Sequence, residues 1–276
     1  MSHIITLLLG ITDYDFMRNA LLAGTIAAIV AALVGYFIVV RNLAFAGHAL
    51  SHISFAGAAG AGLLNLSPLT GQLLLTLLAA GGMGWLGEQR RKSDTAIGII
   101  LAFALGLGVL FLSLYTNYAG QAMAILFGDV LGVSRPLLLQ MLWFSLPCLL
   151  ALALIARPLL FASLEPELAE AKGVSLPLIS SLFLLIVAVA VTEVSQVVGI
   201  LLVFTLLIGP AATALNWTRN FWPGIILAVV LAVITVWLGI ILAYLTDWPA
   251  SFWISCLSLV VYLLSLAKTS WRRVKR

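Results

Sequence analysis

The stretch WPGIILAVVLAVITVWLGIILAY, residues 222–244, decides the class of fold. It has 23 residues and no charged side chain. An α-helix needs about 20 predominantly apolar residues to cross the hydrocarbon core of a bilayer. The stretch therefore predicts a transmembrane helix.

The whole chain shares this apolar character. It has 276 residues, of which 63% are hydrophobic and 9% are charged, whereas soluble domains carry roughly 25% charged residues. This composition excludes a water-soluble fold. The alternating pattern of membrane strands is absent from the sequence, so the backbone must satisfy its hydrogen bonds within helices. We predict an all-α, multi-pass membrane protein in contact with lipid.

Short polar breaks separate further apolar runs along the chain. We expect a bundle of eight or nine transmembrane helices in one domain over 1–276, because 177–215 holds either two short spans or one span and a re-entrant piece. The segment 121–134 is too short and too rich in glycine to cross, and it predicts a short helix packed on the bundle. The nine candidate spans are 18–40, 43–64, 69–87, 95–115, 136–157, 177–192, 198–215, 222–244 and 250–267.

The basic residues predict the orientation. If the loop GEQRRKSD at 87–94 is cytoplasmic and nine spans alternate, only Arg18 and Arg135 of the 14 Lys and Arg residues lie outside. The positive-inside rule then places the C-terminus and its basic tail, 268–276, in the cytoplasm. The net charge of +4 is explained by loops and tail, and it does not indicate nucleic-acid binding.

The long cytoplasmic loop, about 158–176, contains a predicted short helix. Its sequence LEPELAEAKGVS (164–175) has proline near the start and glycine after the end, as helices commonly do. The segment is either a solvated connector or a docking element for another protein. Its exposed or punctuating residues are Glu165, Pro166, Glu167, Glu170, Lys172 and Gly173.

Two of the three histidines of the chain, His48 and His52, lie in the apolar stretch 43–64. Residues four apart share one helix face, and ionisable groups inside a membrane usually face the bundle interior or an aqueous path. The small residues around them allow other helices to approach closely. The pair is either structural, bonded to backbone carbonyls, or a pair of metal ligands, since neutral imidazole binds zinc well; we interpret it as ligands.

Other features of the sequence narrow the function. Glu193 and Asp129 are further candidates for a metal path, although each could instead lie at the membrane interface. The chain lacks the P-loop pattern G-x-x-x-x-G-K-[ST], the zinc-protease pattern H-E-x-x-H and a G-x-S-x-G elbow. We therefore expect that it is not an enzyme, and that it forms a transport pore driven by a partner.

Several stretches resemble the permease subunits of bacterial ATP-binding-cassette (ABC) importers for zinc, manganese and iron. The resemblance runs from about 17 to 267, and VVRNLAFAGHALSHISFAGAAGA (39–61) is its most distinctive part. The similar stretches are 16–24, 39–61, 125–134, 164–175 and 197–214.

The resemblance implies a type II importer-like homodimer in the bacterial cytoplasmic (inner) membrane. It implies that 164–175 couples each permease to a cytoplasmic ABC ATPase dimer, which hydrolyses ATP, and that an extracytoplasmic binding protein delivers the metal. No permanently bound cofactor is expected, because the metal is cargo. The family carries an acidic residue, usually Asp, where this chain has His48, and its next histidine corresponds to His52; that pair is implicated in the metal path.

The exchange of carboxylate for imidazole favours zinc over manganese, because it makes the ligand set softer. Two pairs meeting at a dimer axis could approach a tetrahedral four-nitrogen site. The alternatives stay open: a permease for manganese or iron, a permease for a metal chelate such as a siderophore or cobalamin, and, in a different class, an intramembrane metal-dependent enzyme or sensor.

Overall fold

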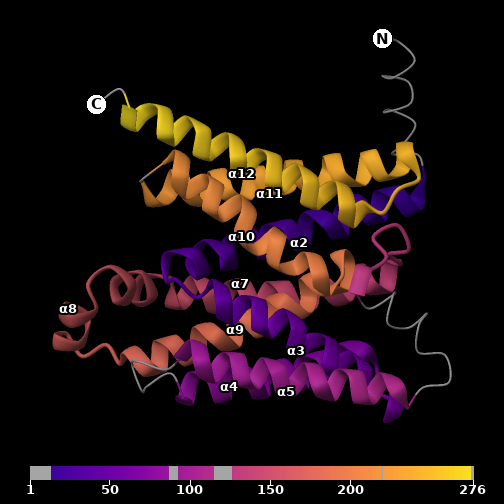
Figure 1. Cartoon of the computed structure of the whole chain (residues 1–276), viewed down its shortest axis with the longest axis horizontal. Helices are drawn as coiled ribbons and strands as arrows, with labels where there is room; N and C mark the ends of the chain where they lie inside the picture. The colour runs from indigo at the N-terminus through magenta and orange to yellow at the C-terminus, as the bar shows by residue number, and fades with distance from the viewer. Residues whose placement is uncertain (1–13, 87–92, 115–125, 219, 275–276) are drawn as a thin grey trace.

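The chain folds as a bundle of helices lying roughly side by side (Figure 1). The computed structural model describes residues 14–86, 93–114, 126–218 and 220–274. The helices are α2 (Asp15–Val40), α3 (Ala44–Leu63), α4 (Pro68–Leu86), α5 (Ser93–Ser113), α7 (Arg135–Leu164), α8 (Pro166–Ala171), α9 (Leu176–Val198), α10 (Ile200–Trp217), α11 (Phe221–Thr246) and α12 (Ala250–Val274).

Length and hydropathy identify membrane-crossing candidates among these helices. Within the described residues, 7 helices are long and apolar enough to cross a bilayer: α2, α5, α7, α9, α10, α11 and α12. The prediction of an all-helical membrane protein is confirmed. The helices α3 and α4, which coincide with the predicted spans 43–64 and 69–87, are not among the 7. Histidine, serine, glycine and glutamine dilute their apolar content.

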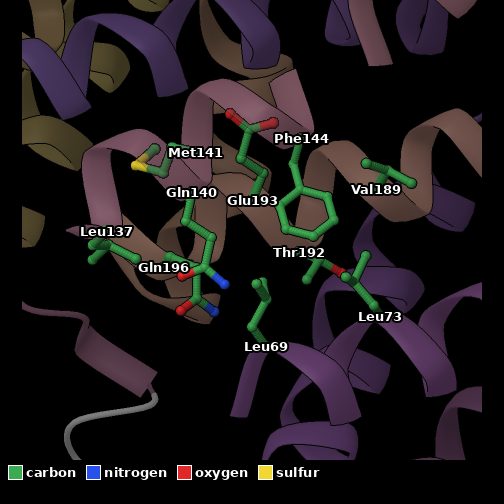
Figure 2. Close-up of a pocket in the computed structure, with 10 residues that line it drawn as sticks. All are labelled: Leu69, Leu73, Leu137, Gln140, Met141, Phe144, Val189, Thr192, Glu193 and Gln196. Atoms are coloured by element: carbon green, nitrogen blue, oxygen red, sulfur yellow. The ribbon is translucent and has the colours of Figure 1, made fainter. Parts of the chain in front are cut away.

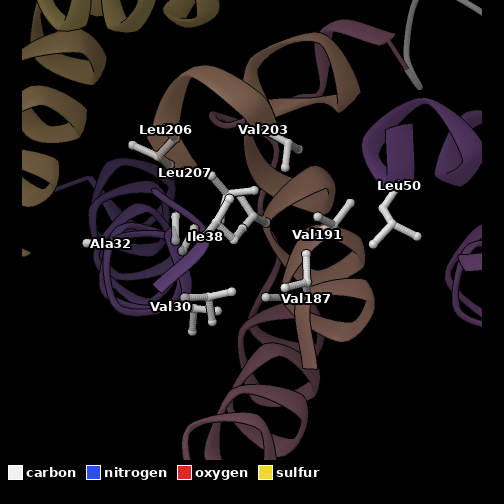
Figure 3. Packing of buried hydrophobic residues seen from close by; sticks show 14 of the residues in the cluster. Val30, Ala32, Ile38, Leu50, Val187, Val191, Val203, Leu206 and Leu207 are labelled. Carbon is white, nitrogen blue, oxygen red and sulfur yellow. The ribbon is translucent and has the colours of Figure 1, made fainter. Parts of the chain in front are cut away.

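The helix α2 lies at the centre of the bundle. About two-thirds of its apolar window is buried (67%), whereas only 22% is buried for α5 and α12, which lie at the periphery. Figure 3 shows the core where α2, α3, α9 and α10 meet. Branched aliphatic side chains from these four helices interdigitate there, so van der Waals packing joins them. The labelled residues are Val30, Ala32, Ile38, Leu50, Val187, Val191, Val203, Leu206 and Leu207.

Asparagine and glycine end three of the helices in the same way. Asn42, Asn65 and Gly173 have positive φ angles of 57°, 55° and 82°. In each case the next residue donates a backbone hydrogen bond to the carbonyl five positions back, as in Leu43 to Ile38 at 2.9 Å. This is the Schellman arrangement, which satisfies the last carbonyls of a helix. It explains why the predicted spans 18–40 and 43–64 end where they do. It also confirms the predicted end of the short helix in 164–175.

The helices α7, α9 and α12 extend past the ends that the sequence predicts, and α12 continues through most of the predicted basic tail to Val274. The helix α7 continues past 157 to Leu164, because Leu159 and Ala162 pack into the core and this packing outweighs the cost of Pro158. The stretch TEVSQ at 192–196 is not a break, because α9 runs through it to Val198. Its polar side chains are buried against α4 and α7, as described below.

The segment before α7 also differs from the prediction. Residues 121–125 lie outside the described residues, as do the basic loop at 87–92 and the last two residues of the tail. In 126–134, only Leu126 and Phe127 are helical. Gly128 has φ +68°, and its backbone packs closely against Gly199. A left-handed residue followed by a tight turn ends the helix, so most of this described part is irregular.

Candidate functional site

The helix α3 carries the histidine pair and lies within the bundle, in contact with α4, α5, α9 and α10. Glycines let its neighbours approach. A Cβ atom on Gly60 would lie 2.9 Å from the Phe111 ring of α5, and one on Gly108 of α5 would lie 2.9 Å from Phe55. Each glycine in a helix costs about 0.5–1 kcal/mol relative to alanine, and close packing offsets that cost.

The rings of His48 and His52 lie edge to face on one side of α3. Their centroids are 4.5 Å apart, with an angle of 84° between the ring planes. The predicted pairing of the two side chains on one helix face is therefore confirmed. Both side chains are half-buried, and the ring of Phe204, on α10, packs against His48 with centroids 4.9 Å apart.

One nitrogen of the pair has no partner. His48 Nδ1 is buried and makes no hydrogen bond to a described residue. A neutral imidazole has one nitrogen with a free lone pair, and that nitrogen binds metal. A structural histidine bonded through both nitrogens would leave none available. The geometry therefore leaves His48 Nδ1 available to bind a metal ion.

A groove of about 390 Å³ lies between α10 and α12, and neither histidine is among the residues that line it. Phe204, which contacts His48, forms part of its wall, and Gly209, Ala212 and Ser255 also line it. Small residues of this kind commonly lie where transmembrane helices approach each other. Phe204 thus lies between His48 and a groove whose wall also includes the larger side chains of Ile208, Leu259 and Tyr262.

Glu193 lies elsewhere in the bundle, inside α9 rather than between two short spans. It is 3% exposed, and neither carboxyl oxygen has the geometry of a hydrogen bond to a described residue. Ser145 of α7 lies beside it but donates its hydrogen bond to the Met141 carbonyl at 2.6 Å. Burying an unpaired carboxylate is costly, so this position calls for a neutral carboxylic acid or a bound cation.

The cavity at Glu193 is small (Figure 2). It has a volume of about 10 Å³, which is about what one water molecule requires. In Figure 2 the amides of Gln140 and Gln196 lie at one end of the group and the Glu193 carboxylate at the other. The space suits a single water better than a hydrated metal ion.

A polar network beside this cavity went unrecognised in the sequence. Gln72 Oε1, on α4, accepts hydrogen bonds from Gln196 Nε2 at 2.6 Å and from Ser195 Oγ at 3.2 Å. One turn away, the hydroxyls of Thr76 and Thr192 are 3.1 Å apart. The spacing of Thr192 and Gln196, four residues apart on one helix, is the signal that could have indicated a buried polar face.

Asp129 lies in an exposed turn. Its Oδ1 accepts a hydrogen bond from the Gly132 amide at 2.9 Å, which closes the turn. Among the described residues, no group of three or more His, Cys, Asp and Glu side chains gathers as a metal site. The structure thus brings His48 and His52 together, without joining Glu193 or Asp129 to them.

The short helix α8 lies at one end of the bundle, the same end as the C-terminal end of α12 (Figure 1). Ala169 is fully buried and anchors it. Lys172 lies over the Phe161 ring of α7, with Nζ 5.6 Å from the ring centroid. Around this anchor lies an exposed surface with three glutamates and one lysine, formed by Glu165, Pro166, Glu167, Leu168, Glu170, Lys172 and Gly173.

Comparison with known proteins identifies relatives over nearly the whole chain. The model of the ABC 3 transport family matches residues 13–269. A manganese transport system membrane protein, MntC of Halalkalibacterium halodurans, is 32% identical over 248 residues, covering 90% of this chain and 85% of the relative. A probable iron transport system membrane protein of Haemophilus influenzae is 31% identical over 263 residues, covering 94% and 96%. The zinc uptake protein ZnuB of that species is 30% identical over 259 residues, covering 92% and 98%.

A solved structure has the same fold. PsaBC from Streptococcus pneumoniae, in complex with Fab, aligns with a TM-score of 0.87 and 28% identity, covering 99% of this chain and all of that one. The helices described above therefore follow the arrangement found in the matched chain of that complex.

Proposed function

Because the chain belongs to the ABC 3 transport family, we propose that it is the permease subunit of an ATP-driven importer that carries zinc. A metal-ion ABC permease is supported by relatives named for manganese, iron and zinc transport. The choice of zinc is a finer proposal, and it rests on the ligand chemistry of this chain. The single observation that carries it is the facing pair of imidazole rings on α3.

His48 and His52 are the proposed transient ligands. Their rings are adjacent, and His48 Nδ1 is buried without a hydrogen-bond partner. A metal ion entering the bundle loses water ligands, and imidazole nitrogens replace them. Two nitrogens form an incomplete site for zinc, which is usually four-coordinate. An incomplete site binds loosely, and a transported ion must leave again.

A second copy of the chain would complete the site. The histidines are half-buried, a groove that includes Gly209 and Ala212 lies beyond Phe204 on α10, and lipid tails provide no ligand for an imidazole nitrogen. We propose that two copies pack across this face, so that two histidine pairs approach one axis.

The partners and topology complete the proposal. The exposed acidic side of α8 supports docking of a cytoplasmic ABC ATPase dimer, and hydrolysis of ATP there drives the change between outward-open and inward-open states. A binding protein on the outer side delivers the metal. We propose eight or nine spans in a single domain over 1–276, a coupling helix at α8 and a cytoplasmic C-terminus, in the bacterial cytoplasmic membrane.

Uptake of radioactive zinc and manganese into vesicles that contain the whole complex tests this function. We expect ATP-dependent zinc uptake that His48→Ala and His52→Ala each reduce by at least about tenfold, the loss typical when support for a bound metal is removed. Ser51→Ala is the matched control, because Ser51 is buried on the same helix and bonds only to the Gly47 carbonyl at 3.0 Å. Full zinc uptake by both histidine variants would assign the pair a structural role.

Competition extends the same assay. A metal-chelate importer would take up an ion only as its chelate, and excess unlabelled iron chelate or cobalamin would compete for uptake of the labelled chelate. Excess chelate would not reduce the uptake of free zinc. We expect free zinc to be the cargo.

A further inference from the structure

Arg41 joins the start of α3 to two other helices. It is the C-cap residue of α2, three residues before α3 begins at Ala44. Its Nη1 donates to Ser163 Oγ, on α7, at 3.3 Å, and its Nη2 donates to Ser180 Oγ, on α9, at 2.7 Å. One guanidinium group thus bridges three helix ends.

The two serines flank the proposed coupling helix. Ser163 lies in the last turn of α7, directly before α8, and Ser180 lies in the first turns of α9, directly after it. The helix α8 is fixed to the bundle by the buried Ala169, and the Val174 amide donates to the Ala169 carbonyl at 3.0 Å. A displacement of α8 therefore pulls on both helices that Arg41 holds.

The hydrogen bonds of Arg41 can break and re-form when these helices move. The hydrogen-bond partners of the guanidinium are two hydroxyls, and no ion pair between described residues includes it. Its Nε is buried and has no hydrogen-bond partner in the part of the chain that the structure describes. A cleft of about 340 Å³ at this place is lined by Arg41, Ala46 of α3, Ala162 of α7 and, on α8, Pro166 and the acidic Glu170. The guanidinium is held by hydroxyls and shares its cleft with the Glu170 carboxylate, so it can exchange hydrogen-bond partners without first breaking an ion pair.

We propose that Arg41 is a positioning residue that transmits the movement of α8 to α3 and its histidines. The proposal rests on the proposed function and goes beyond it, because it assigns the mechanical link between the ATPase surface and the metal path. His48 lies in the second turn of α3, which begins at Ala44. A shift of the α2–α3 corner therefore moves the first ligand directly, since helices transmit displacement as rigid elements.

The test measures zinc uptake and ATP hydrolysis together in vesicles holding the whole complex. We expect Arg41→Ala to hydrolyse ATP at close to the unchanged rate but to import about tenfold less zinc per ATP, a typical coupling energy between two sites. The double variant Ser163→Ala/Ser180→Ala keeps the guanidinium and should show the same loss. Arg41→Lys, which can reach only part of this bridge, should fall between. Arg18→Ala, in which an exposed ion pair with Asp15 is removed, is the control and should change neither rate.

A purely structural role for Arg41 predicts a different result. Uptake and hydrolysis would then fall in proportion, and that outcome, or unchanged zinc uptake per ATP in both variants, would overturn the proposal. If Arg41→Ala does not assemble, the double serine variant decides the question.

Hydrogen exchange separates this inference from the proposed function. We expect ATP to change the exchange of backbone amides in 44–52 in the unchanged complex, and the double serine variant to lose this change. The readout needs no metal. If the unchanged complex imports neither zinc nor manganese, the proposed function fails, while loss of the ATP response in the variant still supports the link. Retention of the response overturns it.

Discussion

Gly57 of α3 and Gly71 of α4 are in backbone contact. A Cβ atom placed on either residue would collide with the carbonyl oxygen of the other. Backbone atoms cannot rotate away as the end of a side chain can, so the two helices touch at a distance that only glycine permits. This contact fixes the distance of α3 from α4.

Gly71→Ala should therefore destabilise the protein. Overpacking of this kind costs about 1–3 kcal/mol, and unfolding of the purified protein in detergent measures it. The matched control is Gly82→Ala on the same helix, where a Cβ atom would meet nothing within 4 Å. Alanine is the better helix former by about 1 kcal/mol, so the control should be neutral or stabilising. Equal effects at both positions would contradict the close packing.

The turn after α3 gives a second prediction. Asn65 has φ 55°, a left-handed conformation that costs most residues about 1–2 kcal/mol. We expect Asn65→Ala to lower the free energy of unfolding by about 1 kcal/mol and Asn65→Gly to leave it unchanged or higher, because glycine adopts this conformation freely. The same unfolding assay compares the two; if glycine destabilises as much as alanine, the side chain rather than the backbone matters.

Glu193→Gln tests the buried carboxyl group. The amide has nearly the same shape and no charge to desolvate, so we expect stability equal to or above that of the unchanged protein and full zinc uptake. Glu193→Lys should destabilise by several kcal/mol, since it buries a charge without a partner. Loss of uptake by Glu193→Gln at unchanged stability would instead assign this residue to the metal path.

His48→Asp tests the choice of metal. A carboxylate suits manganese better than imidazole does, whereas imidazole favours zinc. We expect the ratio of zinc to manganese uptake to fall by about tenfold, which corresponds to about 1.4 kcal/mol. Competition between the two ions in one vesicle sample measures this ratio directly. An unchanged ratio would show that selectivity arises elsewhere, for example in the binding protein.

Glu167→Lys tests the docking surface. Glu167 is exposed in the first turn of α8, and reversal of its charge should weaken binding of the ATPase by about tenfold through the loss of a complementary charge. Association of the purified subunits, measured over a range of salt concentrations, gives the size of the effect. Asp94→Lys, at the exposed start of α5, is the control and should bind normally. Comparable weakening by both variants would indicate a diffuse charge effect.

The spans and the histidine pair could be predicted because their signals are local. The stretch 222–244 becomes α11, Phe221–Thr246, with small changes at its ends. Four-residue spacing alone places His48 and His52 on one face. Pro166 and Gly173 mark the ends of α8 through their own backbone preferences.

The buried polar network could not be predicted because its partners are distant in sequence. Gln72 and Gln196 are 124 residues apart, and the polarity of TEVSQ is the same whether its side chains meet water or another helix. The single sequence therefore suggested a loop where α9 continues. Only the position of α4 beside α9 shows that these groups satisfy one another.

The bridge at Arg41 has a consequence for how the protein is made. Its two serine partners lie 122 and 139 residues later in the chain. During synthesis, α2 and α3 enter the membrane long before Ser180 leaves the ribosome, and the guanidinium remains at the water interface until then. The α2–α3 corner is thus completed late in biogenesis, and a nascent chain halted before α9 would carry its histidine helix without the tie that positions it.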